Sequence, residues 1–225
     1  IARLKKSGAI IIGKANLNEF FSKPTEFDLN PPPWNPWNPE RMSVGSSSGS
    51  GAALAARMAS GTIGVDGGGS VRLPAGAHNL YGIKPTHGLV SRTGVGRSEH
   101  SEICPLGLTA LDTAMMLEAM AGYEPNDDLS WAGDVPEYAA NIDTDINGWR
   151  IGVPRRFIDS VPNESEVLEG FADFLKELQQ LGCEIVEFDI QGMAEARAAT
   201  FLTLFSNSYQ RHQKTVKKDW RTYGP

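Results

Sequence analysis

The sequence is poor in cysteine. Its 225 residues include only two, Cys104 and Cys183, which lie far apart along the chain. Two cysteines give no disulfide framework, and their separation matches none of the close Cys and His spacings that bind a metal. We therefore predict two buried thiols, no metal or other cofactor, and a cytoplasmic location, where thiols stay reduced.

Long hydrophobic runs and an excess of positive charge are also missing. The longest apolar patch, AIII at residues 9–12, has the length of a strand, whereas a membrane span needs about 18 or more apolar residues. The net charge of -6 disfavours nucleic acid or an anionic membrane as a direct partner. Hydrophobic residues amount to 40% and charged residues to 21%, the composition of an ordinary globular protein with a sizeable core.

Neither end of the sequence reads as the boundary of a domain. The chain starts with neither Met nor a signal peptide, and residues 1–8 (IARLKKSG) look like the last turns of a helix with Gly8 as its C-cap. Residues 222–225 (TYGP) stop in a polar segment. We expect residues 1–225 to be part of a single domain whose N-terminal and C-terminal parts lie outside this chain.

Helices and strands alternate along the chain. The pattern of helix, glycine and strand occurs twice, in LKKSGAIII near the start and in LQQLGCEIV, where a helix over 163–182 precedes a strand over 183–188. Such units predict helices packed on a mixed or parallel sheet, an α/β architecture. Periodicity and composition further predict strands at 9–13, 62–65, 81–83 and 149–154, and helices at 2–7, 51–59, 111–120 and 193–218.

Two glycine–serine segments flank the predicted helix at 51–59 and the strand after it. The first, GSSSGSG, covers residues 45–51, and the second, DGGGS, covers residues 66–70. Consecutive glycines let successive backbone N–H groups turn toward one point and form an anion-binding nest. Ser70 stands at the end of that nest, and acyl transfer needs this combination of a nucleophile and oxyanion donors. The alternative for an isolated GGGS is a plain glycine-rich turn.

Patterns of other enzyme classes do not fit these segments. Residues 45–49 match G-x-S-x-G with Ser47 as nucleophile, but the residues before them are polar and rich in proline instead of forming an apolar strand. No lysine follows as in a P-loop, and the G-x-G-x-x-G dinucleotide pattern is broken at Leu54. No catalytic motif surrounds any of the four histidines, which are His78, His87, His100 and His212.

Three segments, GSSSGSGAALAA, VDGGGSVRLPA and GIKPTHGLVSRTGV, together resemble the amidase signature family. GKANLNEFF and NPWNPER upstream, and WRIGVP, LGCEIVEFD and HQKTVKKDWRTYGP downstream, are also similar to segments of that family. The motifs follow the family's order, and the 24 residues from Ser46 to Ser70 match without a gap. The resemblance covers essentially the whole chain. It implies a mixed central sheet with helices on both faces, incomplete here at both ends.

The resemblance implies catalytic roles for both segments. The family cleaves or transfers amides through a nucleophilic serine, a bridging serine that follows a cis peptide bond, and a lysine. Ser70 is then the nucleophile and Ser46 the bridging serine, with a cis bond between Gly45 and Ser46. The oxyanion hole is formed by the N–H groups of the loop before the nucleophile, which here belong to Gly67, Gly68, Gly69 and Ser70.

Supporting roles follow from the same resemblance. Asp66 and Arg72 match the family's aspartate before the glycines and its arginine after the nucleophile. We interpret both, together with Ser47, as residues that organise the site without touching the substrate. Phe21 follows a segment that lines the acyl pocket in some relatives and is a candidate substrate contact.

The sequence also departs from the family's pattern. The family's lysine base lies before Ile1, and Lys14 matches a different, structural lysine, so we expect the base outside this chain. Val44 replaces a usual glycine, and Gly67 replaces a residue that more often carries a side chain. In SEHSEICPLG, Glu102 stands near the usual aspartate. These differences leave the physiological amide open.

We predict an amide hydrolase that acts on linear amides, with a small-molecule amide as its partner and a homodimer among the assemblies to consider. Two alternatives remain. One is a non-catalytic amidase-like subunit or scaffold, and the other is a glutamine-dependent tRNA amidotransferase subunit. A lysine at the family's position upstream of Ile1 would favour an enzyme over a scaffold. Ammonia transfer to a partner subunit would indicate the amidotransferase.

Overall fold

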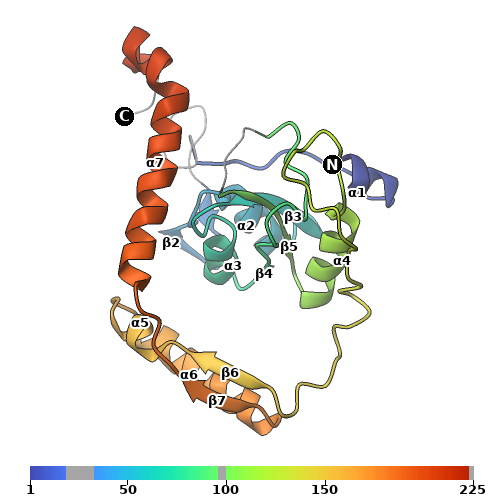
Figure 1. The fold of residues 1–225 in the computed structure, drawn as a ribbon, viewed down its shortest axis with the longest axis vertical. Coiled ribbons are helices and arrows are strands. Elements are labelled where there is room, and N and C mark those ends of the chain that lie inside the picture. Colours follow the sequence, from blue (N-terminus) through green and yellow to red (C-terminus); the bar gives the residue numbers. More distant parts are fainter. Residues whose placement is uncertain (19–32, 96–99, 223–225) are drawn as a thin grey trace. The chain divides into compact units, whose positions relative to one another are not determined.

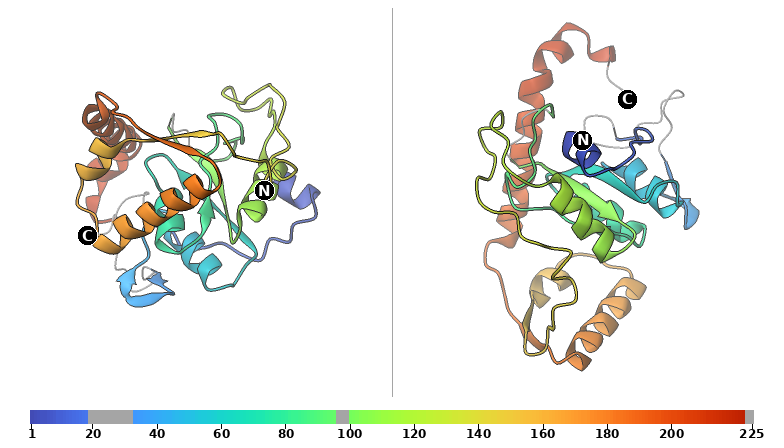
Figure 2. Two further views of the ribbon diagram at one scale, coloured as in Figure 1. Left: turned by 90° about the horizontal axis from the view of Figure 1, so that it is seen from below. Right: turned by 90° about the vertical axis from the view of Figure 1, so that its right-hand side faces the viewer.

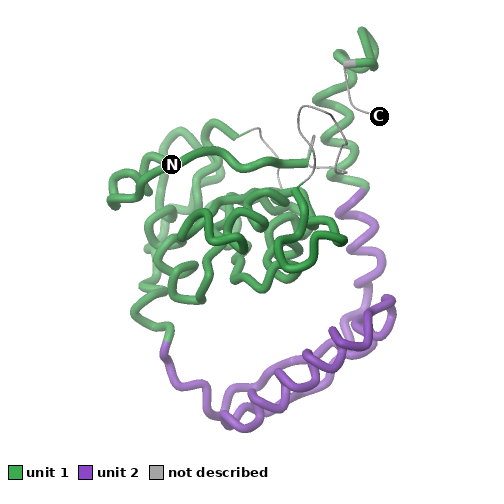
Figure 3. Tube along the Cα trace, turned by 180° about the vertical axis from the view of Figure 1, so that it is seen from behind, with its two compact units in different colours: residues 1–142, 202–225 green, residues 143–201 purple. Residues whose placement is uncertain are grey.

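The computed structural model describes residues 1–18, 33–95 and 100–222. The chain consists of two compact units (Figure 3). Unit 1 comprises residues 1–142 and 202–225, and unit 2 comprises residues 143–201. Both glycine–serine segments belong to unit 1, so the candidate site can be described within that unit alone.

Unit 1 is built on a three-stranded antiparallel sheet. Its strands, in the order β3–β5–β4, are β3 (Gly61–Asp66), β5 (Glu102–Gly107) and β4 (Tyr81–Gly82) (Figure 1). The register of β3 and β5 runs from Gly61 opposite Gly107 to Asp66 opposite Glu102. No periodicity predicted β5, and Pro105 in its middle argues against a central strand because proline lacks a backbone N–H.

Helices cover both faces of this sheet. They are α1 (Ala2–Lys6), α2 (Ser48–Ala55), α3 (Arg72–Ala77) and α4 (Ala110–Met120). Alternate residues of a strand point to opposite faces. Cys104 and Leu106 accordingly pack with side chains of α2 and α3, whereas Ile63 and Ile103 pack with side chains of α1 and α4. Figure 2 shows the ribbon of α4, in light green, beside the sheet. The predicted α/β class with helices on both sides of a sheet is confirmed for this unit.

A short hairpin precedes α2 in the proline-rich part of the chain. Its strands, β1 (Trp34–Asn35) and β2 (Asn38–Met42), pair antiparallel. The indole Nε1 of Trp37 donates a hydrogen bond to the carbonyl oxygen of His78 at 2.8 Å. The side-chain Nδ2 of Asn35 donates to the carbonyl oxygen of Ala77 at 2.9 Å. These two bonds attach the hairpin to the C-terminal end of α3.

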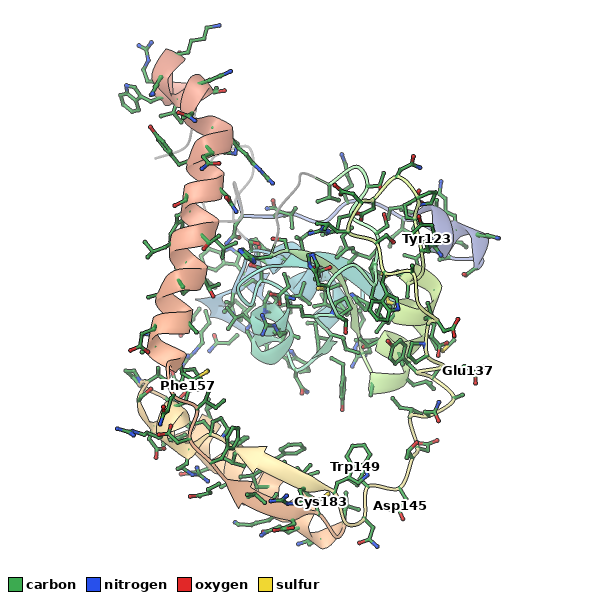
Figure 4. All side chains as sticks on the ribbon, in the orientation of Figure 1. Tyr123, Glu137, Asp145, Trp149, Phe157 and Cys183 are labelled. Carbon is green, nitrogen blue, oxygen red and sulfur yellow. The ribbon has the colours of Figure 1, made fainter. Side chains whose placement is uncertain are left out.

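Unit 2 contains the second helix–glycine–strand pattern. Its elements are β6 (Arg150–Val153), α5 (Arg155–Asp159), α6 (Ser165–Gln180) and β7 (Glu184–Glu187). β6 and β7 pair in parallel, as predicted, and Gly182 has the positive φ of 88° expected after a helix end. Trp149 directly precedes β6 and Cys183 directly precedes β7, at the same end of the strand pair (Figure 4).

The long predicted helix over 193–218 forms with those bounds. α7 (Met193–Lys218) begins in unit 2 and ends in unit 1, and the 3-10 turn η2 (Trp220–Thr222) follows it. None of the α7 residues is buried. Among the residues that the structure describes, no helix has both the length and the apolar character that crossing a membrane requires.

The predicted strand over residues 9–13 is wrong. These residues follow α1 but lie in no strand, and the side chains of Ile10 and Ile12 are 87% and 73% exposed. An apolar run forms a strand only when a neighbouring strand accepts and donates its backbone hydrogen bonds. No described strand pairs with residues 9–13.

Candidate active site

The second glycine–serine segment connects β3 to α3. β3 ends at Asp66, residues Gly67–Ser70 form a turn that we call the glycine loop, and α3 begins at Arg72. Gly69 has a φ of +116°, which residues with a side chain rarely adopt, so this position favours glycine. Ser70, the predicted nucleophile, ends the loop and is partly buried.

Asp66 binds the glycine loop and the first turn of α3. Its carboxylate accepts hydrogen bonds from the N–H groups of Gly69, Val71 and Arg72 at 2.7 to 3.1 Å. The Arg72 guanidinium donates to both carboxylate oxygens at 3.0 Å. Burial of the Asp66 carboxyl raises its pKa and is the largest single effect. The hydrogen bonds from Arg72, Gly69 and Val71 together outweigh it, so the pKa falls from 3.8 to about 2.

The first glycine–serine segment leads into α2. The peptide bond between Gly45 and Ser46 is cis, as predicted. Ser46 is only 3% exposed, and its hydroxyl has no hydrogen-bond partner among the described residues. Buried hydroxyls are nearly always hydrogen-bonded, since an unpaired one loses its bonds to water without compensation. The Ser46 hydroxyl is therefore distinguished from the other buried serines of this segment.

One backbone hydrogen bond joins the two glycine–serine segments. The N–H of Ser47 donates to the carbonyl oxygen of Ser70 at 3.1 Å. Because Ser46 and Ser47 share a peptide bond, this contact places Ser46 next to the end of the glycine loop. The two serines predicted to act together, 24 residues apart in sequence, thus lie in one place.

Ser47 links the start of α2 to β3. Its Oγ accepts a hydrogen bond from the N–H of Val65 at 3.2 Å and lies 3.5 Å from the carbonyl oxygen of Val65. A Cβ added to Gly64 would lie 2.4 Å from Ser47 Oγ, so α2 approaches β3 closely at this point. Ser47 is 1% exposed. Its geometry fits a supporting residue and does not fit the exposed nucleophile of a G-x-S-x-G elbow.

Asn18 belongs to this site, although the sequence analysis did not single it out. Its backbone N–H donates to the carbonyl oxygen of Ser46 at 3.1 Å, and its side-chain Oδ1 accepts from Ser48 Oγ at 2.9 Å. A Cβ added to Gly45 would overlap the Asn18 amide, with only 2.1 Å to Nδ2. The only sequence signal for Asn18 is its place in GKANLNEFF, one of the segments that resemble the family.

The four predicted oxyanion donors differ in their hydrogen bonds. The N–H of Gly69 donates to Asp66 Oδ1 at 2.7 Å. The N–H groups of Gly67, Gly68 and Ser70 donate to no other described residue. Three N–H donors of the glycine loop therefore have no acceptor among the described residues, while the fourth, that of Gly69, stabilises the conformation of the loop.

His78 is fully buried and packs against α2, since a Cβ added to Gly51 would lie 2.8 Å from its Nδ1. Its Nδ1 lies 2.7 Å from the carbonyl oxygen of Pro74, and its Nε2 lies 2.9 Å from Ser43 Oγ. A carbonyl oxygen only accepts hydrogen bonds, so Nδ1 donates to Pro74, and Nε2 is hydrogen-bonded to the Ser43 hydroxyl. Both ring nitrogens are thus occupied, and His78 is a structural residue.

Cys104 and Cys183 are both buried and unpaired, as predicted. Burial, and then the charge of Asp66, raises the pKa of the Cys104 thiol to about 12. No group of three or more His, Cys, Asp or Glu side chains in the described part of the chain could hold a metal ion. Phe21 lies outside the described residues.

Comparison with known proteins identifies the class. The family model named Amidase matches residues 1–223. The chain therefore belongs to the amidase signature family. Among curated proteins it is similar to a glutamyl-tRNA(Gln) amidotransferase subunit of Pseudomonas fluorescens, with 39% identity over 209 residues. The corresponding subunit of Geobacter metallireducens is 36% identical over 230 residues and covers 100% of this chain.

Solved structures agree with this assignment. The structure of the corresponding glutamyl-tRNA(Gln) amidotransferase subunit of Thermotoga maritima has a TM-score of 0.87 at 31% identity. The match covers 98% of this chain and 50% of the Thermotoga chain. A bacterial aryl acylamidase of the amidase signature family has a TM-score of 0.81 at 21% identity, over 97% of this chain and 46% of its own, which shows likeness of fold. The Pseudomonas match covers 90% of this chain and 42% of that protein. The chain thus spans about half the length of the proteins it matches.

Proposed function

We propose that this chain carries the two serines of an amide-cleaving site, with Ser70 as the nucleophile. One observation carries the proposal. The N–H of Ser47 donates a hydrogen bond to the Ser70 carbonyl oxygen, so the buried hydroxyl of Ser46, which has no partner among the described residues, lies beside the glycine loop. A nucleophile, a second hydroxyl able to pass a proton, and uncommitted N–H donors then meet at one place, which is what acyl transfer requires.

In the proposed reaction the Ser70 hydroxyl attacks the carbonyl carbon of the amide. Its proton passes through Ser46 to a lysine, which we expect upstream of Ile1. The carbonyl oxygen takes up negative charge and accepts hydrogen bonds from the N–H groups of Gly67, Gly68 and Ser70. The carbon–nitrogen bond breaks, and the proton returns through Ser46 to the leaving nitrogen. Water then attacks the acyl group, which releases a carboxylic acid and restores Ser70.

Asp66, Arg72 and Ser47 hold these groups in place in the proposed site. Asp66 is bound by Arg72 and fixes the Gly69 and Val71 N–H groups, and Ser47 fixes α2 to β3. We keep Phe21 as a proposed substrate contact. The two unpaired thiols support a cytoplasmic location.

A serine-directed probe tests the assignment in the intact protein. A fluorophosphonate is expected to label Ser70, and Ser70→Ala is expected to abolish labelling and amide turnover together. Ser46→Ala is expected to leave weak residual labelling, slowed by about 100-fold or more. The oxyanion donors and Ser70 remain, but the proton relay is lost, and general acid–base catalysis contributes about 10²–10⁴-fold. The exposed Ser60→Ala serves as the control with unchanged labelling. Labelling at Ser47 or Ser48 in place of Ser70 would contradict the proposal.

The relatives favour one specific form of this activity. Both curated relatives described above are subunits of glutamyl-tRNA(Gln) amidotransferases. Our second candidate is therefore the glutamine-cleaving subunit of an amidotransferase, in which ammonia passes to a partner subunit. Glutaminase activity that rises on addition of a co-purifying partner and glutamyl-tRNA would support it. Turnover of simple aliphatic or aromatic amides without any partner would favour the free-standing hydrolase, and an unreactive Ser70 would favour a non-catalytic scaffold.

A further inference from the structure

Glu102 is a buried carboxyl that the proposed mechanism does not use. It is the first residue of β5, and its side chain is fully buried. Its Oε1 is hydrogen-bonded to Nδ1 of His87, and its Oε2 lies 3.4 Å from the N–H of Gly88. The His87 side chain is 45% exposed, so the pair runs from the interior to the surface of unit 1. Buried carboxylates persist only where such donors compensate for lost water.

Glu102 lies directly beside Asp66. The two residues are paired across the β3–β5 ladder, so their side chains point to the same face of the sheet. Each carboxyl has a partner from another segment, because Arg72 binds Asp66 and His87 binds Glu102. Two neighbouring strand ends are thus fixed by two separate carboxylate pairs at the edge that bears the glycine loop.

The residues just before Glu102 pack against the glycine loop. A Cβ added to Gly67 would lie 2.7 Å from Ser101 Oγ and 3.5 Å from the carbonyl oxygen of His100. Gly67 therefore has the chain at residues 100–101 as its immediate neighbour. If the start of β5 moved, Gly67 would either clash with residues 100–101 or lose its contact with them. Gly67 would then move, and the N–H groups of the glycine loop would point in another direction.

We propose that His87 and Glu102 are positioning residues of the amide-cleaving site. Their hydrogen bond fixes the start of β5, and the start of β5 fixes the glycine loop at Gly67. The inference rests on the proposed function of Ser70. The pair itself makes and breaks no bond to substrate. Its effect is on the orientation of the Gly67 and Gly68 N–H groups, which act when negative charge develops on the substrate oxygen.

The experiment compares three single variants in the intact protein. His87→Ala removes the donor to Glu102 and is expected to slow fluorophosphonate labelling of Ser70 by about 10- to 100-fold, as misplacement of a site by about 1 Å does. His87→Asn keeps a side-chain N–H near the position of Nδ1 and is expected to restore most of the rate. His100→Ala, an exposed histidine on the segment that touches Gly67 through its backbone, is the matched control and should label normally. For amide turnover, kcat should fall in His87→Ala while KM changes little.

A second measurement does not depend on activity. Hydrogen exchange of the amides in residues 66–72 is expected to be faster in His87→Ala than in the wild type and to return toward the wild-type rate in His87→Asn. Should His87→Ala fail to fold, Glu102→Gln, which keeps the buried volume but replaces one acceptor oxygen by a donor, is expected to show the same changes. Normal labelling and normal exchange in the folded His87 and Glu102 variants would overturn the inference. A wild-type protein that labels nowhere would instead overturn the proposed function, and faster exchange in His87→Ala would then still show that the pair positions the loop.

Discussion

At the scale of single residues, Asp66 has the largest number of bonds in the site. Three backbone N–H groups and the Arg72 guanidinium converge on its buried carboxylate. The bond from Gly69 shapes the glycine loop, and those from Val71 and Arg72 orient the first turn of α3. A neutral amide at this position would keep one acceptor but turn a donor toward N–H groups, which leaves buried donors unpaired. Asp66 thus couples the stability of unit 1 to the geometry of the proposed nucleophile.

This coupling predicts a defined dependence of stability on pH. The pKa of Asp66 is lowered from 3.8 to about 2 on folding, so its charged form contributes stability that is fully present above pH 3.8 and lost as pH falls toward 2. A shift of this size corresponds to about 2 kcal/mol in the free energy of unfolding. We expect Asp66→Asn to be less stable than the wild type by at least that amount near neutral pH, with the difference shrinking between about pH 4 and pH 2.

Chemical unfolding of both proteins at a series of pH values measures this difference. Asp134→Asn, at an exposed aspartate, is the control and should follow the wild type throughout. A difference between wild type and Asp66→Asn that stayed constant down to pH 2 would show that the carboxylate charge is not what stabilises the loop.

At the scale of secondary-structure elements, the site depends on the close approach of α2 to β3. Gly64 of β3 faces Ser47 at the start of α2, and a Cβ there would lie 2.5 Å from Val71 Cγ2 as well as 2.4 Å from Ser47 Oγ. Gly49 in α2 has a similar restriction, since a Cβ would lie 2.4 Å from the carbonyl oxygen of Asn16. Packing therefore requires glycine at both positions. For Gly49, which lies in GSSSGSG, this is a structural reason for a small residue in addition to the catalytic role proposed for that segment.

Two glycine-to-alanine substitutions distinguish the cost of inserting a methyl group into a packed core from the effect of helix propensity. Gly64→Ala is expected to destabilise the protein by about 1–3 kcal/mol, the usual cost of inserting a methyl group into a packed core. It should also slow labelling of Ser70, because α2 and the Ser47 hydrogen bond to Ser70 would shift with it. Gly76→Ala in α3 has no atom within 4 Å of the new methyl group and should be neutral or stabilising by up to about 1 kcal/mol, since alanine favours helix more than glycine does.

Thermal melting curves and probe-labelling rates of the two variants decide this point. Equal melting temperatures for Gly64→Ala and the wild type would mean that α2 tolerates a wider separation from β3 than the contacts indicate. A destabilised Gly64→Ala that labels at the wild-type rate would mean that the position of α2 does not control Ser70.

At the scale of the whole molecule, each unit leaves apolar surface uncovered. In unit 2 the apolar stripe of α6 buries only Leu175, while Val167, Phe174 and Leu181 are more than half exposed. In unit 1 the side chains of Ile10 and Ile12 are also more than half exposed. The two strands β6 and β7 cannot cover an apolar stripe of this width on α6. The chain spans 42 to 47% of the length of the curated relatives named above.

We expect the 225-residue chain by itself to be inactive toward amides. Ser70 needs an adjacent base, and the lysine that serves as base in the family is expected before Ile1. The test is an amidase assay on this chain beside a version extended upstream to include that lysine. Turnover only in the extended version, lost again when its lysine becomes alanine, is the expected result. Equal turnover in both would move the base to a histidine or lysine within these residues.

The sequence by itself determined the two glycine–serine segments and the second helix–glycine–strand unit, which ends in β7. These features depend on residue types at short spacing, where backbone conformation and local hydrogen bonds are decided by neighbours along the chain. The family, and with it the cis bond before Ser46, came from the resemblance of several motifs in one order. The same local reasoning wrongly predicted a strand at residues 9–13, because the pattern contains no information about whether a partner strand is present.

Only the tertiary structure decided which polar groups meet. It placed Asn18 against Gly45 and Ser48, paired Glu102 with His87 beside Asp66, and turned the Gly69 N–H toward Asp66 while the Ser46 hydroxyl found no partner among the described residues. Each of these contacts joins residues from different elements or depends on how the loop between them folds. Burial removes water from both groups of each pair, and this is why their hydrogen bond matters for stability. Which groups are buried together depends on the path of the whole chain.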